Sequence, residues 1–343
     1  MGAPISFELP AHLNAAAPPE RRGIRRDRVR LMVSDRVTGH CVHTRFDRLG
    51  DFLKPGDLLV LNNSRTVPAV LTGEWIRHPN RIKKVEIRLA HRLDSCRWEA
   101  LILGGEPRPG DRIRILRELE AEVHKAASPP LVKLRFSLSG PELIAALHQA
   151  GEPVRYEYVG KPWPLHDYQN VFSTVPGSVE PASAGRPFTW EMLLGLKRRG
   201  IGYAFVTLHT GLSDWPGVSG PPSPGQNCEP YFIPREAAER IHHTRNEGGR
   251  VIAVGTTVVR ALESAAGSDG MLAERKGITC LHISRSRPPR VVDGLITGFH
   301  EPEASHLDLL TGFAEPSVLK RMYEEALREE YLWHEFGDVH LIL

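Results

Sequence analysis

The chain has 343 residues, 41% of them hydrophobic and 25% charged, the composition of an ordinary globular protein with room for about two domains. Its net charge of +3 excludes a polycation, and no apolar run approaches the about 20 residues of a membrane-spanning helix, which excludes a membrane protein. The four cysteines lie far apart without a C-x-x-C pair, and the N-terminus lacks the pattern of a secretion signal. We therefore expect a cytoplasmic protein with reduced thiols and no metal site.

The N-terminal segment carries the densest positive charge of the chain. Six arginines fall between positions 21 and 30: Arg21, Arg22, Arg25, Arg26, Arg28 and Arg30. A cluster of this density favours an anionic partner, such as the phosphates of a nucleic acid.

The stretch from about residue 73 to residue 135 is typical of a small β structure. Its strand-sized segments are separated by turns rich in proline and glycine, and they cover residues 84–89, 97–103, 112–116 and 131–136. A short helix is expected to follow at 141–150. This spacing predicts a small antiparallel barrel or sandwich.

The rest of the chain alternates between strand-like and helix-like segments, which indicates an α/β layer. The best strands are 58–61, 203–208, 251–254 and 291–296, and the helices are expected at 190–199, 235–243, 258–264 and 318–329. We predict the fold class α/β, with a large barrel-like α/β domain formed by residues 1–68 and 158–343. A small antiparallel β-barrel domain, residues 69–157, is inserted into it.

Each of the four apolar strands runs into a short polar segment. These segments are Asn62-Asn63-Ser64-Arg65, His209-Thr210-Gly211, Gly255-Thr256-Thr257 and Thr297-Gly298-Phe299-His300. Because ligands of α/β proteins bind at the carboxyl ends of strands, we expect the four segments to form one site. His209 and His300 are candidates for moving a proton there, since an imidazole titrates near neutral pH.

The segment that begins at Gly255 has the features of an anion site. Glycine permits a tight turn, and Thr256 or Thr257 could cap a helix that begins near residue 258. The free N–H groups of the first turn would then bind a carboxylate or phosphate, with Arg260 as a bidentate clamp. The alternative is an ordinary capped helix with Arg260 in an ion pair with Glu263 or another acid.

Residues 251–264 (VIAVGTTVVRALES) resemble the signature of the S-adenosylmethionine:tRNA ribosyltransferase-isomerases of queuosine synthesis. The likeness spans nearly the whole chain. It includes the segments 7–10 (FELP), 55–62 (PGDLLVLN), 64–69 (SRTVPA), 167–169 (DYQ), 177–179 (GSV), 207–209 (TLH) and 337–338 (GD).

The resemblance implies an α/β domain with an inserted β-barrel and a reaction without metal or redox cofactor, in which S-adenosylmethionine is a substrate. Its ribosyl group would be transferred and isomerised onto a 7-aminomethyl-7-deazaguanine base of tRNA, releasing adenine and methionine. The candidate catalytic residues are His209, Arg65 and His300. The candidate substrate-binding residues are Asn62, Tyr168, Gln169, Ala184, Gly185, Thr207, Gly211, Glu229, Gly255, Thr256, Thr257 and Arg260.

The chain departs from the family pattern in the expected site loops. Asn63 stands where the family has aspartate, Pro187 and Asn227 where it has histidines, and Glu303 where it has lysine. These changes leave tRNA open as the acceptor. The alternatives are an enzyme that uses S-adenosylmethionine with a small-molecule acceptor or cleaves it, and an inactive nucleoside- or RNA-binding module. The sequence does not indicate an oligomeric state.

Overall fold

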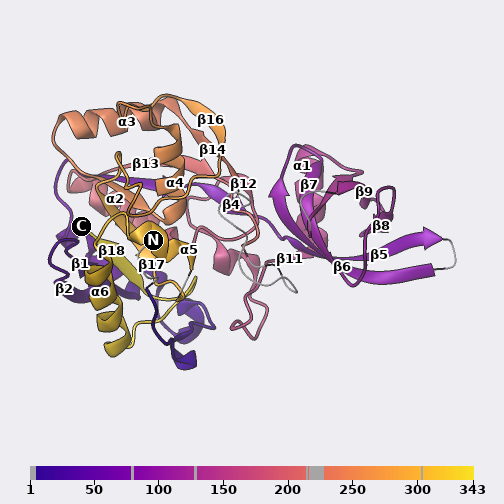
Figure 1. Ribbon diagram of the computed structural model, residues 1–343, viewed down its shortest axis with the longest axis horizontal. Helices are drawn as coiled ribbons and strands as arrows, with labels where there is room; N and C mark the ends of the chain where they lie inside the picture. The colour runs from indigo at the N-terminus through magenta and orange to yellow at the C-terminus, as the bar shows by residue number, and fades with distance from the viewer. Residues whose placement is uncertain (1–4, 79–80, 127–129, 214, 216–227, 303) are drawn as a thin grey trace.

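The computed structural model describes residues 5–78, 81–126, 130–213, 215, 228–302 and 304–343. A large α/β part and a β-barrel lie side by side, with the short parallel pair β4 (Ser64–Thr66) and β12 (Val175–Ser178) between them (Figure 1). The predicted fold class, an α/β domain with an inserted antiparallel barrel, is confirmed. The boundaries at 68/69 and 157/158 stay a prediction.

The large part is built on a nine-stranded mixed sheet in the order β16-β14-β13-β3-β15-β17-β18-β1-β2. Its strands are β1 (Arg30–Ser34), β2 (Cys41–Arg45), β3 (Leu58–Asn62), β13 (Gly202–Leu208), β14 (Glu229–Ile233), β15 (Val251–Val254), β16 (Arg275–Thr279), β17 (Gly294–Gly298) and β18 (Val339–Ile342). The four neighbours β13, β3, β15 and β17 run parallel. Their carboxyl ends therefore share one edge of the sheet.

Helices cover both faces of this sheet. They are α2 (Trp190–Arg198), α3 (Arg235–Asn246), α4 (Thr256–Ala265), α5 (Ser305–Leu310) and α6 (Pro316–Arg328). In β3, Leu58 and Val60 pack into the core formed with α3, α4 and α6, whereas Leu59 and Leu61 pack into the core formed with α2. A strand buried on both faces needs a continuous apolar run rather than an alternating one, and this is the pattern of residues 58–61.

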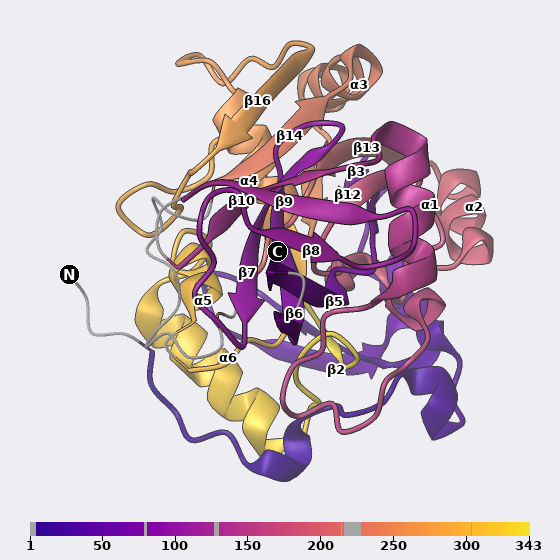
Figure 2. The same ribbon diagram turned by 90° about the vertical axis from the view of Figure 1, so that its right-hand side faces the viewer.

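The barrel is closed because β8 pairs back onto β5. Its strands are β5 (Val70–His78), β6 (Arg81–Arg92), β7 (Arg97–Leu103), β8 (Arg112–Arg114), β9 (Glu120–Ala126) and β10 (Val132–Phe136), and β11 (Gly151–Glu152) adds to β5. The helix α1 (Gly140–Ala150) packs along one side (Figure 2). Inward-facing residues such as Trp98, Ile113 and Leu134 are fully buried in its core.

The structure corrects the sequence predictions at several places. The strand expected at 291–296 is β17, Gly294–Gly298, because Asp293 still lies in a turn where its carboxylate accepts a hydrogen bond from the backbone N–H of Val251. The strands that were not predicted are β1, β2, β4, β5, β9, β11, β12, β14, β16 and β18. Among the described residues, no helix is both long and apolar enough to cross a bilayer.

The expectation of four reduced thiols is also wrong, since Cys228 and Cys280 form a disulfide. The antiparallel pairing of β14 with β16 sets Glu229 opposite Thr279, and the cysteines are the next residues outward. Their separation of 52 residues hid this pairing in the sequence. Cys41 and Cys96 are free thiols.

Candidate functional site

Asn62, the last residue of β3, joins the ends of neighbouring segments. Its side-chain oxygen accepts hydrogen bonds from the backbone N–H groups of Ser64 and Leu208, both at 3.0 Å. Its amide nitrogen donates to the carbonyl of Leu208 at 2.9 Å and to the hydroxyl of Thr257 at 3.3 Å. The predicted convergence of β3, β13 and the start of α4 is therefore present, and Asn62 is the buried residue that holds these ends together.

His209 follows β13 and lies in a network of hydroxyl groups. Its Nδ1 is 2.7 Å from Oγ of Ser64, which is 2.6 Å from Oγ of Ser178. Burial, aided by the positive charge of Arg92, lowers the pKa of His209 to about 4. Gly177 packs against the ring so closely that a Cβ atom there would be 2.7 Å from Nδ1. His209 is thus neutral at physiological pH and firmly positioned.

Gly255 is the N-cap residue of α4, and the helix begins at Thr256. The prediction that Thr256 or Thr257 is the cap is wrong, because Gly255 has a φ of 95°, which only glycine adopts readily. Thr256 and Thr257 instead supply the first two N–H groups of the helix, which have no acceptor within the helix itself. Ala184 lies next to this turn.

Arg260 forms an ion pair with Glu229 inside the protein, as the alternative interpretation of the sequence predicts, although with a different acid from Glu263. Its guanidinium also donates to the carbonyl oxygens of Leu281 (3.2 Å) and Thr279 (3.3 Å). The second oxygen of Glu229 accepts the backbone N–H of Gly211 at 3.0 Å. Arg260 and Glu229 therefore connect α4, β14, β16 and the segment after β13.

His300 follows β17 and stays at that strand end. Its Nε2 is 2.8 Å from the hydroxyl of Thr297, and its ring stacks on His306 at 4.6 Å. Burial and the neighbouring imidazoles lower the pKa of His300 well below its usual value. Within the part of the chain that the structure describes, no three His, Cys, Asp or Glu side chains are gathered so as to hold a metal ion.

Two of the predicted binding residues, Tyr168 and Gln169, make contacts that hold parts of the fold together. The side chain of Gln169 makes two hydrogen bonds to the backbone of Thr66. Its oxygen accepts the N–H of Thr66 at 3.2 Å, and its nitrogen donates to the carbonyl of Thr66 at 2.7 Å. Tyr168 is buried against Phe336, with ring centroids 5.0 Å apart. Tyr168 ends η5, a 3₁₀ helix at Leu165–Tyr168, and Gln169 is the next residue. Their contacts attach the end of η5 to the rest of the fold.

The remaining predicted residues lie around the strand ends. The hydroxyl of Thr207 donates to the side-chain oxygen of Asn63 at 2.6 Å. Gly185 fits closely against Asn170, where a Cβ atom would come within 2.7 Å of the amide nitrogen. Arg65 is exposed and donates to the carbonyl of Ser173 at 3.4 Å.

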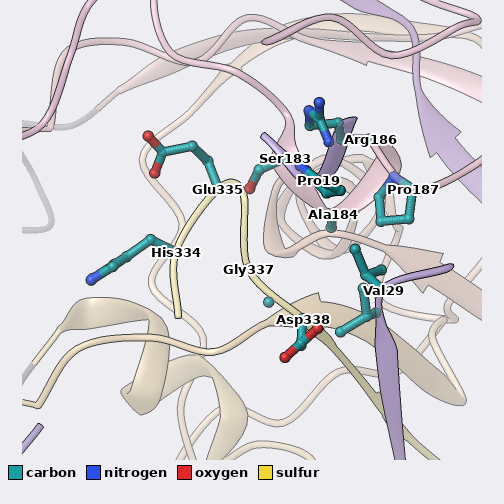
Figure 3. A pocket seen from close by; sticks show the side chains of 12 residues that line it. Pro19, Val29, Ser183, Ala184, Arg186, Pro187, His334, Glu335, Gly337 and Asp338 are labelled. Carbon is teal, nitrogen blue, oxygen red and sulfur yellow. The ribbon is translucent and has the colours of Figure 1, made fainter. Parts of the chain in front are cut away.

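A small cavity beside Ala184 brings in side chains that were not among the predicted site residues. A cavity of about 10 Å³, the room of one water molecule, is lined by residues that include Ser183, Ala184, Arg186, Pro187, His334 and Glu335 (Figure 3). The Tyr158 hydroxyl donates to Glu335, and the Tyr158 ring stacks on His334 at 4.0 Å. Burial raises the pKa of Glu335 to about 7. Only the Tyr-x-Tyr pattern at 156–158 could have drawn attention to this group.

The N-terminal arginines are bound to acceptors within the protein, so this segment is not a free basic patch. Arg21 pairs with Asp167 (3.3 Å), Arg25 with Asp27 (2.7 Å), Arg26 with Glu20 (3.0 Å) and Arg28 with Asp47 (3.0 Å), while Arg22 and Arg30 donate to the carbonyls of Phe336 (2.7 Å) and Glu329 (2.5 Å). The family departures at Asn227 and Glu303 lie outside the described residues.

Comparison with known proteins gives a consistent result. The family model described as queuosine biosynthesis protein matches residues 3–342. An S-adenosylmethionine:tRNA ribosyltransferase-isomerase of a Thermoanaerobacter species is 35% identical, with 98% of each chain covered, and one of Thermus thermophilus is 38% identical, with 95% of this chain and 97% of the relative covered. The crystal structure of an S-adenosylmethionine tRNA ribosyltransferase from Thermotoga maritima is 30% identical, covers 99% of both chains and has a TM-score of 0.55. The chain therefore belongs to the queuosine biosynthesis protein family.

Proposed function

We propose that this chain transfers and isomerises the ribosyl group of S-adenosylmethionine onto a 7-aminomethyl-7-deazaguanine base in tRNA. The full-length similarity to relatives with this activity in their names is the observation that carries the proposal. Adenine and methionine would leave, and epoxyqueuosine would form. A tRNA substrate would place the reaction in the cytoplasm, and the chemistry requires no resident cofactor.

The methionine end of the donor is assigned to the start of α4. Its carboxylate would accept hydrogen bonds from the N–H groups of Thr256 and Thr257, where the helix dipole also favours a negative charge. The positive φ of Gly255 lets the backbone turn toward the ligand. Arg260 lies one turn further along the helix, but its guanidinium is paired with Glu229, so we assign it to holding the start of α4 in place rather than to the carboxylate itself.

The reacting part of the donor is assigned to the segment around His209. A sulfonium acidifies the hydrogens on the neighbouring C5′ atom, so removal of a proton there can start the rearrangement. Arg65, His209 and His300 are the proposed catalytic residues, and the buried ends of β3 and β13 would keep water away from the intermediate. Asn62, Thr207 and Gly211 support these groups through the hydrogen bonds described above.

The acceptor is tested by measuring adenine release from S-adenosylmethionine. The full chain is incubated with the donor alone, with tRNA that carries the deazaguanine precursor, and with the same tRNA lacking it. Release only with the precursor tRNA supports the proposal. Release without tRNA would instead indicate a small-molecule acceptor or simple cleavage, and binding without release would indicate an inactive module.

A further inference from the structure

A row of hydrogen bonds runs from the backbone to His209 through two buried serines. The N–H of Thr210 donates to Oγ of Ser178 at 3.1 Å, Ser178 and Ser64 are 2.6 Å apart, and Ser64 is 2.7 Å from Nδ1 of His209. Ser178 has no exposed surface, and Ser64 is 2% exposed. The row joins β4, β12 and the segment after β13, so it depends on the assembled fold.

The direction of this row follows from counting donors and acceptors. If Ser178 donates to Ser64 and Ser64 donates to Nδ1 of His209, each hydroxyl has both a donor and an acceptor. In the opposite direction Nδ1–H donates to Ser64, Ser64 donates to Ser178, and the proton of Ser178 has no acceptor among the described residues. A buried hydroxyl without an acceptor disfavours that arrangement by roughly tenfold or more in population.

We infer that Ser64 and Ser178 are positioning residues that hold His209 as the neutral tautomer with its proton on Nε2. This inference rests on the proposed function, and it changes the role of His209 within it. Nδ1 is occupied by Ser64, and Nε2 already carries a hydrogen, so the ring has no lone pair with which to take a proton from the substrate. His209 therefore acts as a hydrogen-bond donor to negative charge that develops during the reaction, and another group removes the C5′ proton.

Two further observations agree with this assignment. Burial and the charge of Arg92 keep the imidazole neutral, since its pKa is lowered to about 4. Gly177 covers the Nδ1 and Cε1 side of the ring, because a Cβ atom there would be 2.7 Å from both atoms. Nε2 is the ring nitrogen left for a ligand, as no residue in the described part of the chain hydrogen bonds to it. A neutral imidazole that donates from one fixed nitrogen is an established way to polarise a substrate.

Nuclear magnetic resonance of the full chain with ¹⁵N-labelled histidine tests the tautomer directly. The two ring nitrogens of a neutral imidazole differ strongly in chemical shift according to which one carries the proton, and the His209→Gln variant identifies the signals of His209. Between pH 6 and pH 8 we expect a bare Nδ1 and a protonated Nε2. A protonated Nδ1 in the wild type would overturn the inference.

Variants of Ser64 separate a positioning role from a merely structural one. Ser64→Ala removes the hydrogen bond that favours Nε2–H, so the fraction of the Nδ1–H tautomer should rise above that of the wild type. Adenine release should slow by about tenfold, while the affinity for S-adenosylmethionine stays within about twofold. Ser64→Thr keeps the hydroxyl and should restore both the tautomer and the rate. Ser173→Ala removes a nearby buried hydroxyl outside the row and should behave as wild type.

The outcomes distinguish this inference from the proposed function. An active wild type in which Ser64→Ala alters neither the tautomer nor the rate contradicts the inference alone. A wild type that shows the Nε2–H tautomer but releases no adenine under any condition contradicts the proposed function, while the tautomer assignment stands.

Discussion

Replacing Asn62 with leucine, which has a similar volume, should destabilise the protein far more than the same change at Asn63. The variant leaves the backbone N–H groups of Ser64 and Leu208 without the oxygen that accepts them at 3.0 Å. Each buried donor without a partner costs about 1–3 kcal/mol, so the loss should be about 2–6 kcal/mol. This is a large part of the roughly 5–15 kcal/mol by which a folded domain is stable.

Asn63→Leu is the matched control, because the side chain of Asn63 accepts one hydrogen bond, from Thr207, and its loss should cost about 1 kcal/mol. Urea unfolding followed by circular dichroism gives the midpoint and slope for each variant. Equal midpoints for Asn62→Leu and Asn63→Leu would refute the conclusion that Asn62 holds the strand ends together.

Three other changes test separate parts of the structure. His340 is fully buried and its pKa is lowered to about 3, so as the pH falls below about 6.5 this residue binds a proton only in the unfolded chain. Its contribution to stability should therefore fall by roughly 1.4 kcal/mol per pH unit, in addition to the contributions of the other buried histidines. His340→Met should reduce the pH slope of the stability from urea unfolding by this amount, and an unchanged slope would contradict the reasoning. Arg260→Ala leaves the buried Glu229 carboxylate without its partner and loosens the start of α4, so the affinity for S-adenosylmethionine should weaken about tenfold by calorimetry. Unchanged affinity would show that Arg260 does not support the donor site. The three acceptors described above for Arg260 each adjoin Cys228 or Cys280 in sequence. Dithiothreitol should therefore weaken donor binding in the wild type but not in the Cys228→Ser/Cys280→Ser variant, and an equal response in both would contradict this.

The sequence predicted the elements whose pattern is local. The apolar run at 58–61 and its parallel neighbours were correctly identified, because a strand buried on both faces is mostly a continuous run of apolar residues. Strand β9 was missed although its residues alternate between polar and apolar ones, the pattern of a strand with one buried face. The structure shows this alternation in the barrel, where β9 pairs with β8 and β10.

The position of the candidate site at the carboxyl ends of the parallel strands could be predicted from the sequence. The side-chain contacts within the site could not. The four polar segments after the parallel strands could be placed at one edge, but their partners are distant in sequence. Ser178 contacts Ser64 across 114 residues, and Arg260 is paired with Glu229 across 31. Such contacts depend on which strands are neighbours in the sheet, and the local patterns that identify single strands do not give that order.

The start of α4 is proposed to bind the carboxylate of the donor's methionine. Calorimetric titration of the wild type with S-adenosylmethionine and with its decarboxylated form isolates this contact, because the two ligands differ only in that group. Hydrogen bonds to a charged group are worth about 1.5–3 kcal/mol, so the decarboxylated form should bind at least about tenfold more weakly. Equal affinity for the two ligands would show that the carboxylate does not bind at the start of α4.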